Sequence, residues 1–286
     1  MELTETYPVS TVCQALNLPR SSYYYARRAS NDRSQRGSEE DLRTALLREA
    51  EAWPTYGYRR ITAQLRRQGR RVNGKKVRRL MREMGLQVRK KVQKRRTTDS
   101  RHDFARFPNL IRQLEITHPD QVWTADITYV RLRREFVYLA LILDLFTRNV
   151  RGWHLSRSLD HQLALIALEK ALAKGKPQIH HSDQGVQYAA LPYVQRLQKA
   201  KVKISMAGIG QPTQNPHVER LIRTIKEEEV ELSEYLDYRD AYHQIGRFIE
   251  DVYIRRRIHS SLDYLTPEEF EAQWRTRQAI EAVDVI

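Results

Sequence analysis

Three acidic residues in the C-terminal part of the chain lie in contexts that suit metal chemistry. Asp126 lies in the middle of a strand-like stretch, Asp183 lies just past a second one, and Glu219 lies one turn into an expected helix. A charge inside a core strand costs free energy unless a cation or a metal ion pairs with it. Three such carboxylates form an oxygen cage of the kind that Mg²⁺ or Mn²⁺ prefers. Two such ions activate an attacking oxygen and stabilise a leaving oxygen at a phosphorus centre.

Each acid also has a purely structural interpretation. Asp126 would be a buried partner of an arginine, Asp183 a turn residue before a Gln-Gly pair, and Glu219 an exposed acid on a helix. Taken singly, the residues leave both interpretations open. Their joint placement on a central strand, a neighbouring strand end and a helix favours the metal site.

The elements that must position these acids follow from the hydrophobic pattern. The order of segments predicts an α/β domain with a mixed sheet whose first hairpin is antiparallel. Ligands gather at the carboxyl ends of strands in such sheets. Asn215 and Pro216 form a natural N-cap and first helical position, which places Glu219 at the fourth. The expected strands are 122–130, 136–143, 149–155, 177–181 and 203–206, and the expected helices are 161–174, 191–200 and the segment from 216 onward.

Other polar and aromatic residues near the acids receive structural roles. Trp123 and Tyr129 are expected in the core, and Asp144 in a turn or behind the site. His180 and His181 are expected to pack rather than bind zinc, because no thiolates accompany them.

The N-terminal part of the chain predicts helices and a basic surface. A helix is expected from about residue 40 to 52 after a polar linker at 29–40, and a helix–turn–helix pattern follows with helices at 58–67 and from 74 to about 84. The second of these has the size and charge to enter a major groove, although a bundle helix with a solvated polar face is the alternative. The basic stretch 89–96 is expected to track phosphates. Candidate DNA-binding residues here are Arg59, Arg60, Lys75, Lys76, Arg78, Arg79 and Arg82.

The distribution of charge supports a polyanionic partner. The 286 residues carry a formal net charge of +15, and residues 1–118 hold 27 Lys and Arg against 12 Asp and Glu. Residues 55–96 hold 17 basic residues and one acid, Glu83. The alternative is a basic surface that only contacts solvent. So high an excess of Lys and Arg over Asp and Glu favours a polyanionic partner, and nucleic acid rather than a membrane surface.

Composition excludes several protein classes. The longest apolar run, 136–143, is too short to span a bilayer, and no signal peptide is visible. A single cysteine, Cys13, excludes an internal disulfide framework and a zinc site built on several thiolates. We therefore expect a protein of a reducing, cytoplasmic compartment.

Several short sequence motifs, in order and with fitting spacing, resemble those of a known family. The words at 123–129, 181–188 and 215–220, with 35 residues between Asp183 and Glu219, resemble the three signatures of DDE recombinases. Residues 55–61 and the following basic helix resemble the second helix–turn–helix module of one such family, the B-frame transposases of the insertion-sequence-three family. Residues 8–24 and 259–267 resemble its opening and closing motifs.

The resemblance implies a DNA transposase with a retroviral-integrase-type, ribonuclease-H-like core. It implies that Asp126, Asp183 and Glu219 hold two Mg²⁺ or Mn²⁺ ions for cleavage and strand transfer at element ends. Lys226, seven residues after Glu219, would contact DNA phosphate, and Asn215 would cap its helix and touch DNA. Further implied partners are a second copy in a synaptic complex and an upstream A-frame product, and the expected location is the bacterial nucleoid.

The expected domain organisation divides the chain into N-terminal helical segments and a C-terminal core. All-α helix–turn–helix segments precede the ribonuclease-H-like core. The boundaries are 1–50 for an N-terminal helical region, 51–97 for a helix–turn–helix domain with its basic tether, 98–118 for a linker, 119–275 for the core and 276–286 for a tail.

Two other functions compete with this prediction. One is a DNA-binding regulator with a non-catalytic core, which the presence of all three acids disfavours. The other is a plain ribonuclease-H-like nuclease, which the basic N-terminal part and the 35-residue spacing disfavour.

Overall fold

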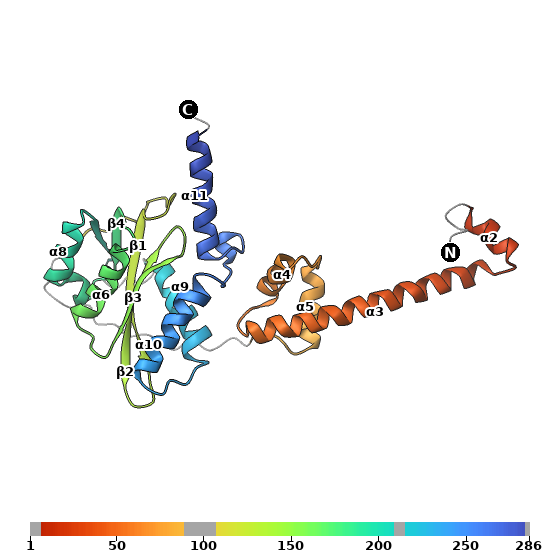
Figure 1. Cartoon of the computed structure of the whole chain (residues 1–286), viewed down its shortest axis with the longest axis horizontal. Helices are drawn as coiled ribbons and strands as arrows, with labels where there is room; N and C mark the ends of the chain where they lie inside the picture. Colours follow the sequence, from red (N-terminus) through yellow and green to blue (C-terminus); the bar gives the residue numbers. More distant parts are fainter. Residues whose placement is uncertain (1–6, 89–106, 209–214, 284–286) are drawn as a thin grey trace. The chain divides into compact units, whose positions relative to one another are not determined.

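The computed structural model describes residues 7–88, 107–208 and 215–283, including their side chains except those of residues 25–38 and 282–283 (Figure 1). The chain divides into two compact units, residues 1–90 and 91–286. The tether expected at 89–96 lies outside the described residues. No helix in the described ranges is long and apolar enough to cross a membrane. The boundaries predicted inside each unit stay predictions.

The first unit is all helical. It contains α2 (Val9–Ala15), α3 (Arg20–Ala52), α4 (Tyr58–Arg67) and α5 (Gly74–Glu83). The linker predicted at 29–40 is wrong, because α3 runs through it without a break. No proline interrupts this segment, and its alanine, arginine, glutamine and glutamate residues are good helix formers.

The end of α3 packs with α4 and α5 into a three-helix module (Figure 1). Leu46, Ile61 and Leu80, one from each helix, are fully buried in it. Asn73 caps α5 by accepting a hydrogen bond from the Lys75 backbone N–H at 2.8 Å. Gly69 and Gly85, which end α4 and α5, have φ of +82° and +69°, a left-handed conformation that favours glycine. The helix–turn–helix prediction is confirmed.

The second unit is built on a five-stranded mixed sheet with strand order β3-β2-β1-β4-β5. The first three strands, β1 (Val122–Arg131), β2 (Phe136–Asp144) and β3 (Val150–Ser156), form an antiparallel meander. The short strands β4 (Ile179–Ser182) and β5 (Lys203–Met206) extend the sheet parallel to β1. The predicted mixed sheet with an antiparallel first hairpin is confirmed.

One face of the sheet is covered by α6 (His161–Leu172), α7 (Val186–Ala189) and α8 (Leu191–Lys199). Helix α6 lies against β3 at Gly152, where a Cβ atom would stand 2.2 Å from the carbonyl oxygen of Ala167. Any larger residue at position 152 would therefore push α6 off the sheet.

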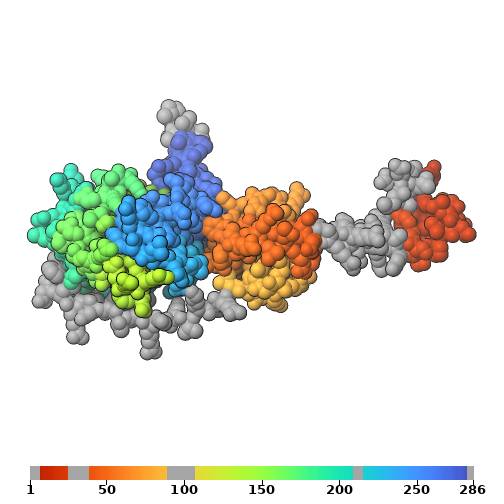
Figure 2. All heavy atoms as spheres, turned by 60° about the horizontal axis from the view of Figure 1, so that its bottom comes forward, coloured from red at the N-terminus to blue at the C-terminus, as the bar shows by residue number. Residues whose placement is uncertain are grey.

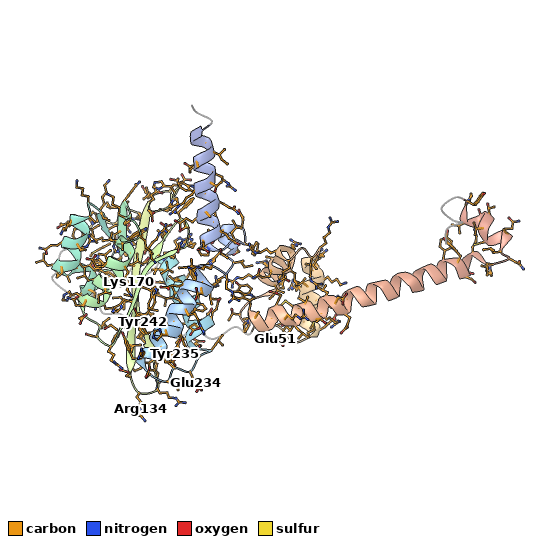
Figure 3. The ribbon with its side chains drawn as sticks, viewed as in Figure 1. Glu51, Arg134, Lys170, Glu234, Tyr235 and Tyr242 are labelled. Atoms are coloured by element: carbon orange, nitrogen blue, oxygen red, sulfur yellow. The ribbon has the colours of Figure 1, made fainter. Side chains whose placement is uncertain are left out.

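The other face is covered by α9 (Pro216–Ile225) and α10 (Tyr238–Arg247), which continue into the π-helical turns Lys226–Val230 and Phe248–Tyr253. Helices α6 and α10 meet beside β3, where the Lys170 Nζ donates a hydrogen bond to the Tyr242 hydroxyl at 2.9 Å (Figure 3). The Trp153 ring lies under the same ammonium group at 5.0 Å. This contact joins the two helical layers at the edge of the sheet.

After a short 3₁₀ turn (Ser260–Leu262), the last helix α11 (Pro267–Val283) begins on the sheet and projects away from its unit (Figures 1 and 2). Its first turns are fixed by Glu271, which accepts hydrogen bonds from Arg151 at 2.9 and 3.0 Å and from Asn149 at 2.9 Å. The Phe146 ring packs against Phe270 at 5.4 Å.

Candidate active site

Two of the predicted acids stand near the end of the parallel pairing of β1 with β4. Thr124 pairs with His181 as the last pair of this ladder. Asp126 stands two residues further along β1, and Asp183 stands one residue past the end of β4. Trp123 and Ala125 pack under α6 to α8, and alternation therefore turns Asp126 toward the face that α9 covers. Asp126 is only 5% exposed, whereas Asp183 is half-buried.

One oxygen of each aspartate is held by a backbone N–H group. Asp126 Oδ1 accepts from the Ile127 N–H at 2.8 Å, and Asp183 Oδ1 accepts from the Gly185 N–H at 3.0 Å. These bonds stabilise the ionised carboxylates and fix their orientation.

Asn215 fastens the start of α9 to β1. Its side-chain amide donates to the Ala125 carbonyl at 3.0 Å, and its side-chain oxygen accepts from the Thr124 hydroxyl. Asn215 occupies the predicted N-cap position, but the predicted capping hydrogen bond is wrong because its side chain makes none to α9. The buried polar groups of β1 take that side chain instead.

Glu219 lies half-buried on the first turns of α9, on the helix that Asn215 fastens beside Asp126. Among the described residues, no three His, Cys, Asp or Glu side chains are close enough to share one metal ion. The structure therefore holds Asp126 on β1, Asp183 just past β4 and Glu219 on α9, without a finished three-ligand cage among the described residues. Carboxylate oxygens such as those of Asp126 and Asp183, each fixed by a backbone N–H group, are of the kind that a hard cation such as Mg²⁺ or Mn²⁺ prefers.

Lys226 directly follows α9 and lies two turns beyond Glu219. Its Nζ stands 4.4 Å from the centre of the Tyr129 ring. Tyr129 is 59% exposed, so its predicted place in the core is wrong. Strand β1 extends past the end of β4, and this residue belongs to the part that the parallel strand does not flank. Trp123 is fully buried, as predicted.

The two histidines beside Asp183 pack as expected. His180 Nε2 lies 3.0 Å from the Tyr193 hydroxyl, and His181 Nδ1 lies 2.9 Å from the Ser205 hydroxyl. Burial, with a smaller effect of His181, lowers the pKa of His180 to about 3, so this ring is neutral at pH 7. Neither histidine belongs to a metal-binding group of three within the residues described.

Asp144 also has its predicted turn role. It is fully buried and accepts hydrogen bonds from the Thr147 N–H at 2.7 Å, the Phe146 N–H at 3.0 Å and the Asp120 N–H at 2.6 Å. This carboxylate holds the turn between β2 and β3 closed.

The predicted DNA-binding residues of the first unit divide into two groups. Lys76 and Arg79 face α3, where both form ion pairs with Glu39 at 3.4 and 3.0 Å. Arg79 also pairs with Glu83 at 3.0 Å. These two residues therefore hold the helices of the module together.

The second group lies on the exposed surface of the same module. No ion pair is found for Arg59, Lys75, Arg78 or Arg82 within the part of the chain that the structure describes. Arg59 and Arg78 lie over the Tyr58 ring at 5.7 and 5.5 Å, and Arg60 lies over the Tyr56 ring at 5.0 Å. The exposed members of this group are Arg59, Lys75, Arg78 and Arg82.

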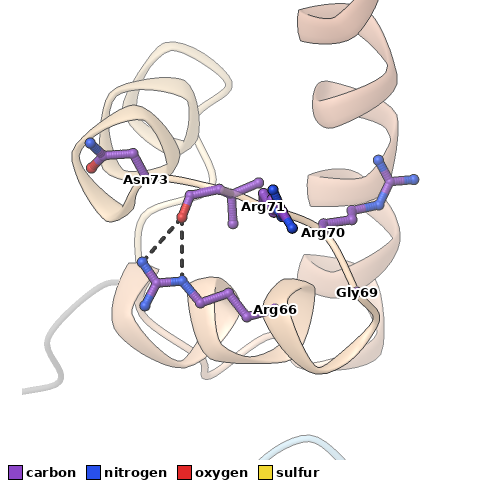
Figure 4. Close-up of a pocket in the computed structure, with 6 residues that line it drawn as sticks. Arg66, Gly69, Arg70, Arg71 and Asn73 are labelled. Carbon is purple, nitrogen blue, oxygen red and sulfur yellow. Dashed lines mark hydrogen bonds between the residues drawn. The ribbon is translucent and has the colours of Figure 1, made fainter.

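The turn between α4 and α5 forms an open, basic hollow of about 650 Å³ (Figure 4). Arg66 fixes its floor, because its Nε and Nη2 donate to the Val72 carbonyl at 3.3 and 3.1 Å. Arg70 and Arg71 complete the basic lining and are exposed. These three arginines are not among the predicted DNA-binding residues, although they lie within the basic segment 55–96.

Comparison with known protein families matches both units. The family "HTH-like domain" matches residues 38–96, and two families described as "Integrase core domain" match residues 116–212 and 200–267. The transposase for insertion sequence element IS629 from Shigella sonnei is 34% identical over 277 residues, covering 94% of this chain and 93% of that protein. Transposase InsF for insertion sequence IS3A from Escherichia coli (strain K12) is 30% identical, covering 93% and 94%. The chain belongs to the IS3 family of transposases.

Solved structures similar to this IS3-family transposase include retroviral integrases. The HTLV-2 integrase catalytic core domain in complex with magnesium (trimeric form) has a TM-score of 0.44 and 14% identity, and covers 54% of this chain and 97% of that chain. A simian T-cell lymphotropic virus intasome has a TM-score of 0.48 and 15% identity, and covers 78% and 73%.

The segment of this IS3-family transposase that matches the HTH-like domain begins at residue 38, inside α3. It therefore includes Glu39, the acid that pairs with Lys76 and Arg79. Sequence reasoning gave Glu39 no role, because the residue lay at the edge of the predicted linker.

Proposed function

We propose that this chain catalyses cleavage and strand transfer of DNA at the ends of an insertion sequence, as the B-frame part of an IS3-family transposase. The observation that carries the proposal is that Asp126 and Asp183 both stand just past the last residue pair of β1 and β4, with α9 and its Glu219 fastened to β1 by Asn215.

The three carboxylates would hold two divalent cations, Mg²⁺ or Mn²⁺. When bound, these ions neutralise charge at the scissile phosphate and favour the ionised form of the attacking oxygen. The protein's part is positional. Backbone N–H groups fix Asp126 and Asp183, while the contact of Asn215 with Ala125 holds the start of α9, the helix of Glu219, on β1.

The reaction has two phosphoryl-transfer steps. Water first attacks the phosphorus at the element end, a P–O bond breaks, and the DNA 3′-oxygen leaves as a hydroxyl. That 3′-hydroxyl then attacks a second phosphodiester and displaces its 3′-oxygen, which takes up the proton. No covalent intermediate with the protein is required.

DNA is held by two surfaces. Lys226 contacts phosphate near the reacting end, and its ammonium group is oriented by the Tyr129 ring. Asn215 acts chiefly on α9, since both ends of its amide are engaged by β1. The exposed residues that face the duplex are Arg59, Lys75, Arg78 and Arg82. Arg60, which lies over the Tyr56 ring, adds positive charge beside them.

We propose two partners for the chain. A second copy joins in a synaptic complex, because two element ends must meet, and an upstream A-frame product joins by fusion or association. The place of action is the bacterial cytoplasm, at the nucleoid.

A Mn²⁺-dependent cleavage and joining assay on DNA with the element's ends tests the proposal. The native chain and its fusion to the A-frame product are compared with Asp183→Asn in each. Joined product from a native form but not from Asp183→Asn is the expected result. DNA binding without any reaction, in the fusion as well, would instead indicate a DNA-binding regulator, and cleavage that ignores element ends would indicate a plain nuclease.

A further inference from the structure

The end of the β1–β2 hairpin presents aromatic rings to solvent. Tyr129 on β1 is 59% exposed, and Phe136 on β2 is 51% exposed. The two rings stand edge to face with their centres 5.8 Å apart. Two adjoining rings left exposed at the end of a sheet are candidates for a binding surface.

The register of the hairpin places these rings and two further side chains on one face. Tyr129 pairs with Tyr138, and Arg131 pairs with Phe136. Paired residues of an antiparallel ladder point to the same face, and so do residues two apart on one strand. Helices α6 to α8 cover this face further along the sheet, where Tyr138 is half-buried against them. The hairpin end extends beyond that cover and carries three rings and one guanidinium group on a single face.

Positive charge flanks the two exposed rings. The guanidinium carbon of Arg131 lies 5.8 Å from the centre of the Phe136 ring, and the Lys226 Nζ lies 4.4 Å from the centre of the Tyr129 ring. Arg134, at the tip of the hairpin, is a further exposed basic residue (Figure 3). Rings beside cations match the two parts of a nucleotide, because bases stack on aromatic rings and phosphates bind cations.

Acidic side chains of this region are engaged in contacts of their own. Between the two exposed rings the sequence holds three arginines and one acid, Glu135, which forms an ion pair at 3.0 Å with the arginine that follows β3. After α9, Glu228 accepts hydrogen bonds from Arg257 at 2.7 Å, and Glu229 accepts one from the Tyr235 hydroxyl at 3.2 Å. The charge beside the rings therefore stays positive, which favours a nucleic acid over a second protein surface.

The rings stand on the strand of the first catalytic acid. Tyr129 follows Asp126 by three residues, which is about 10 Å along β1. The two side chains point to opposite faces by alternation. Strand β4 pairs with β1 only as far as Thr124, so no described strand flanks β1 here on that side. Lys226, at the end of α9, nevertheless contacts Tyr129, and a DNA strand can follow the same path around this edge.

We propose that the hairpin face formed by Tyr129, Arg131, Phe136 and Tyr138 binds unpaired nucleotides of a DNA strand. Their bases stack on the two exposed rings, and their phosphates contact Arg131 and Lys226. Rings reach the faces of bases only where the bases are unpaired, whereas a duplex offers base edges and phosphates. The role of these nucleotides as the end of the strand that is cleaved and joined rests on the proposed function.

Two variants of Phe136 separate stacking from apolar contact. Phe136→Leu keeps an apolar side chain without an aromatic face, and Phe136→Trp keeps the face. The position is half exposed, so both variants should retain the melting temperature of the native chain. We expect Phe136→Leu to weaken the binding of unpaired DNA at the hairpin by about tenfold, the effect of one lost base–ring contact, and Phe136→Trp to keep native affinity or exceed it.

Arg131 is tested by the salt dependence of the same binding. Arg131→Gln should reduce the slope of log affinity against log salt by about 0.7, the value for one phosphate contact on a single strand. Arg133→Gln is the matched control, because Arg133 belongs to the same hairpin and forms an ion pair with Glu234 at 3.4 Å. We expect its slope to equal that of the native chain.

The experiment uses the full chain and an oligothymidylate that carries one 5-iodouracil, and mass spectrometry maps the crosslinks formed under ultraviolet light. The crosslink yield at Tyr129 against oligonucleotide concentration gives the dissociation constant of the hairpin separately from that of the helix–turn–helix module. A duplex with the iodouracil inside a base pair is the control. The expected result is a crosslink at Tyr129 from the single strand and not from the duplex, with weaker binding in Phe136→Leu and native binding in Phe136→Trp.

Other results would overturn the single-strand surface. Crosslinks confined to the helix–turn–helix module, equal yields from single strand and duplex, or a native dissociation constant in Phe136→Leu would each remove it. Joined product in the cleavage and joining assay would then leave the proposed function standing. Self-association that Phe136→Leu abolishes, without a crosslink at Tyr129, would make this face a docking surface for a second copy. Crosslinks at Tyr129 without joined product from the native or the fused chain would overturn the proposed function and leave the surface.

Discussion

The side-chain amide of Asn215 donates to the carbonyl oxygen of Ala125 at 3.0 Å, which fixes the N-cap residue of α9 next to the residue that precedes Asp126. Helix α9 carries Glu219, so this one contact couples the third acid to the strand of the first. The two residues are 90 positions apart in the sequence, and their contact makes the start of α9 part of the candidate active site.

Asn215→Ala tests this clamp. The variant leaves the Thr124 hydroxyl and the Ala125 carbonyl without their partner, so we expect the free energy of unfolding to fall by about 1–3 kcal/mol. Strand transfer should fall further than stability explains, while binding of element ends by the first unit is retained. Denaturant unfolding and the joining assay measure both effects. A Thr124→Val, Asn215→Ala double-variant cycle isolates their coupling, and a coupling energy near zero would contradict the clamp.

Arg78→Ala and Arg79→Ala should separate the two groups of basic residues. Arg78 is exposed beside the Tyr58 ring, whereas Arg79 pairs with Glu39 and Glu83. We expect Arg78→Ala to weaken DNA binding and to reduce the slope of log affinity against log salt by about 0.9 per lost phosphate contact. Arg79→Ala should change that slope little and lower the stability of the three-helix module. Fluorescence anisotropy over a range of salt concentrations measures the slopes, and equal slopes for both variants would show that the division is wrong.

The buried ion pair between Arg151 and Glu271 should dominate the attachment of α11. Their side chains are 9% and 8% exposed, and the distance is 2.9 Å. Glu271→Ala leaves the Arg151 charge buried with fewer partners, and we expect a loss of about 3–5 kcal/mol in denaturant unfolding. The exposed pair Arg133–Glu234 is the matched control, and Arg133→Ala should cost at most about 1 kcal/mol. Similar losses for both variants would contradict this account of α11.

Because the buried ring of His180 is neutral in the folded chain, we expect the chain to lose stability in acid. Burial, with a smaller effect of His181, lowers its pKa to about 3 in the folded chain, below the usual value of 6.5. Between pH 3 and pH 6.5 the unfolded chain therefore binds one more proton at His180 than the folded chain does. The stability that the neutral ring contributes is fully present above pH 6.5 and is lost as the pH falls toward 3. The slope is at most about 1.4 kcal/mol per pH unit for this one proton. Urea unfolding at several pH values should show a flatter dependence of stability on pH for His180→Gln than for the native chain. An unchanged profile for His180→Gln would count against a neutral, buried ring.

The sequence predicted most of the elements because local patterns determine them. The strands at β1, β2 and β3 have near-continuous apolar stretches, and Asn73 with Gly74 marks the start of α5. The linker at 29–40 was wrong because polar composition alone does not stop a helix. Long-range relations were beyond reach: the exposure of Tyr129 depends on where β4 ends, and the clamp of Asn215 depends on the buried partners that β1 presents.

The site itself was predictable as residue types and not as geometry. The motifs around Asp126 and Asp183 predict both acids as site residues, and the structure places them just past the last residue pair of β1 and β4. Nothing in the local sequence shows that Lys76 and Arg79 are neutralised by Glu39, because that depends on the packing of α3 against α5.

Cleavage of the chain by bound Fe²⁺ tests most directly whether Asp126, Asp183 and Glu219 share one divalent cation site. With ascorbate and peroxide, Fe²⁺ in this site generates radicals that cut the nearest backbone, and mass spectrometry maps the cuts. We expect cuts in three separate segments, β1 near Asp126, the β4–α7 connection near Asp183 and the first turns of α9 near Glu219. All three should disappear with excess Mg²⁺ and in Asp183→Asn. Cuts that persist in Asp183→Asn, or that leave α9 intact, would contradict a shared site.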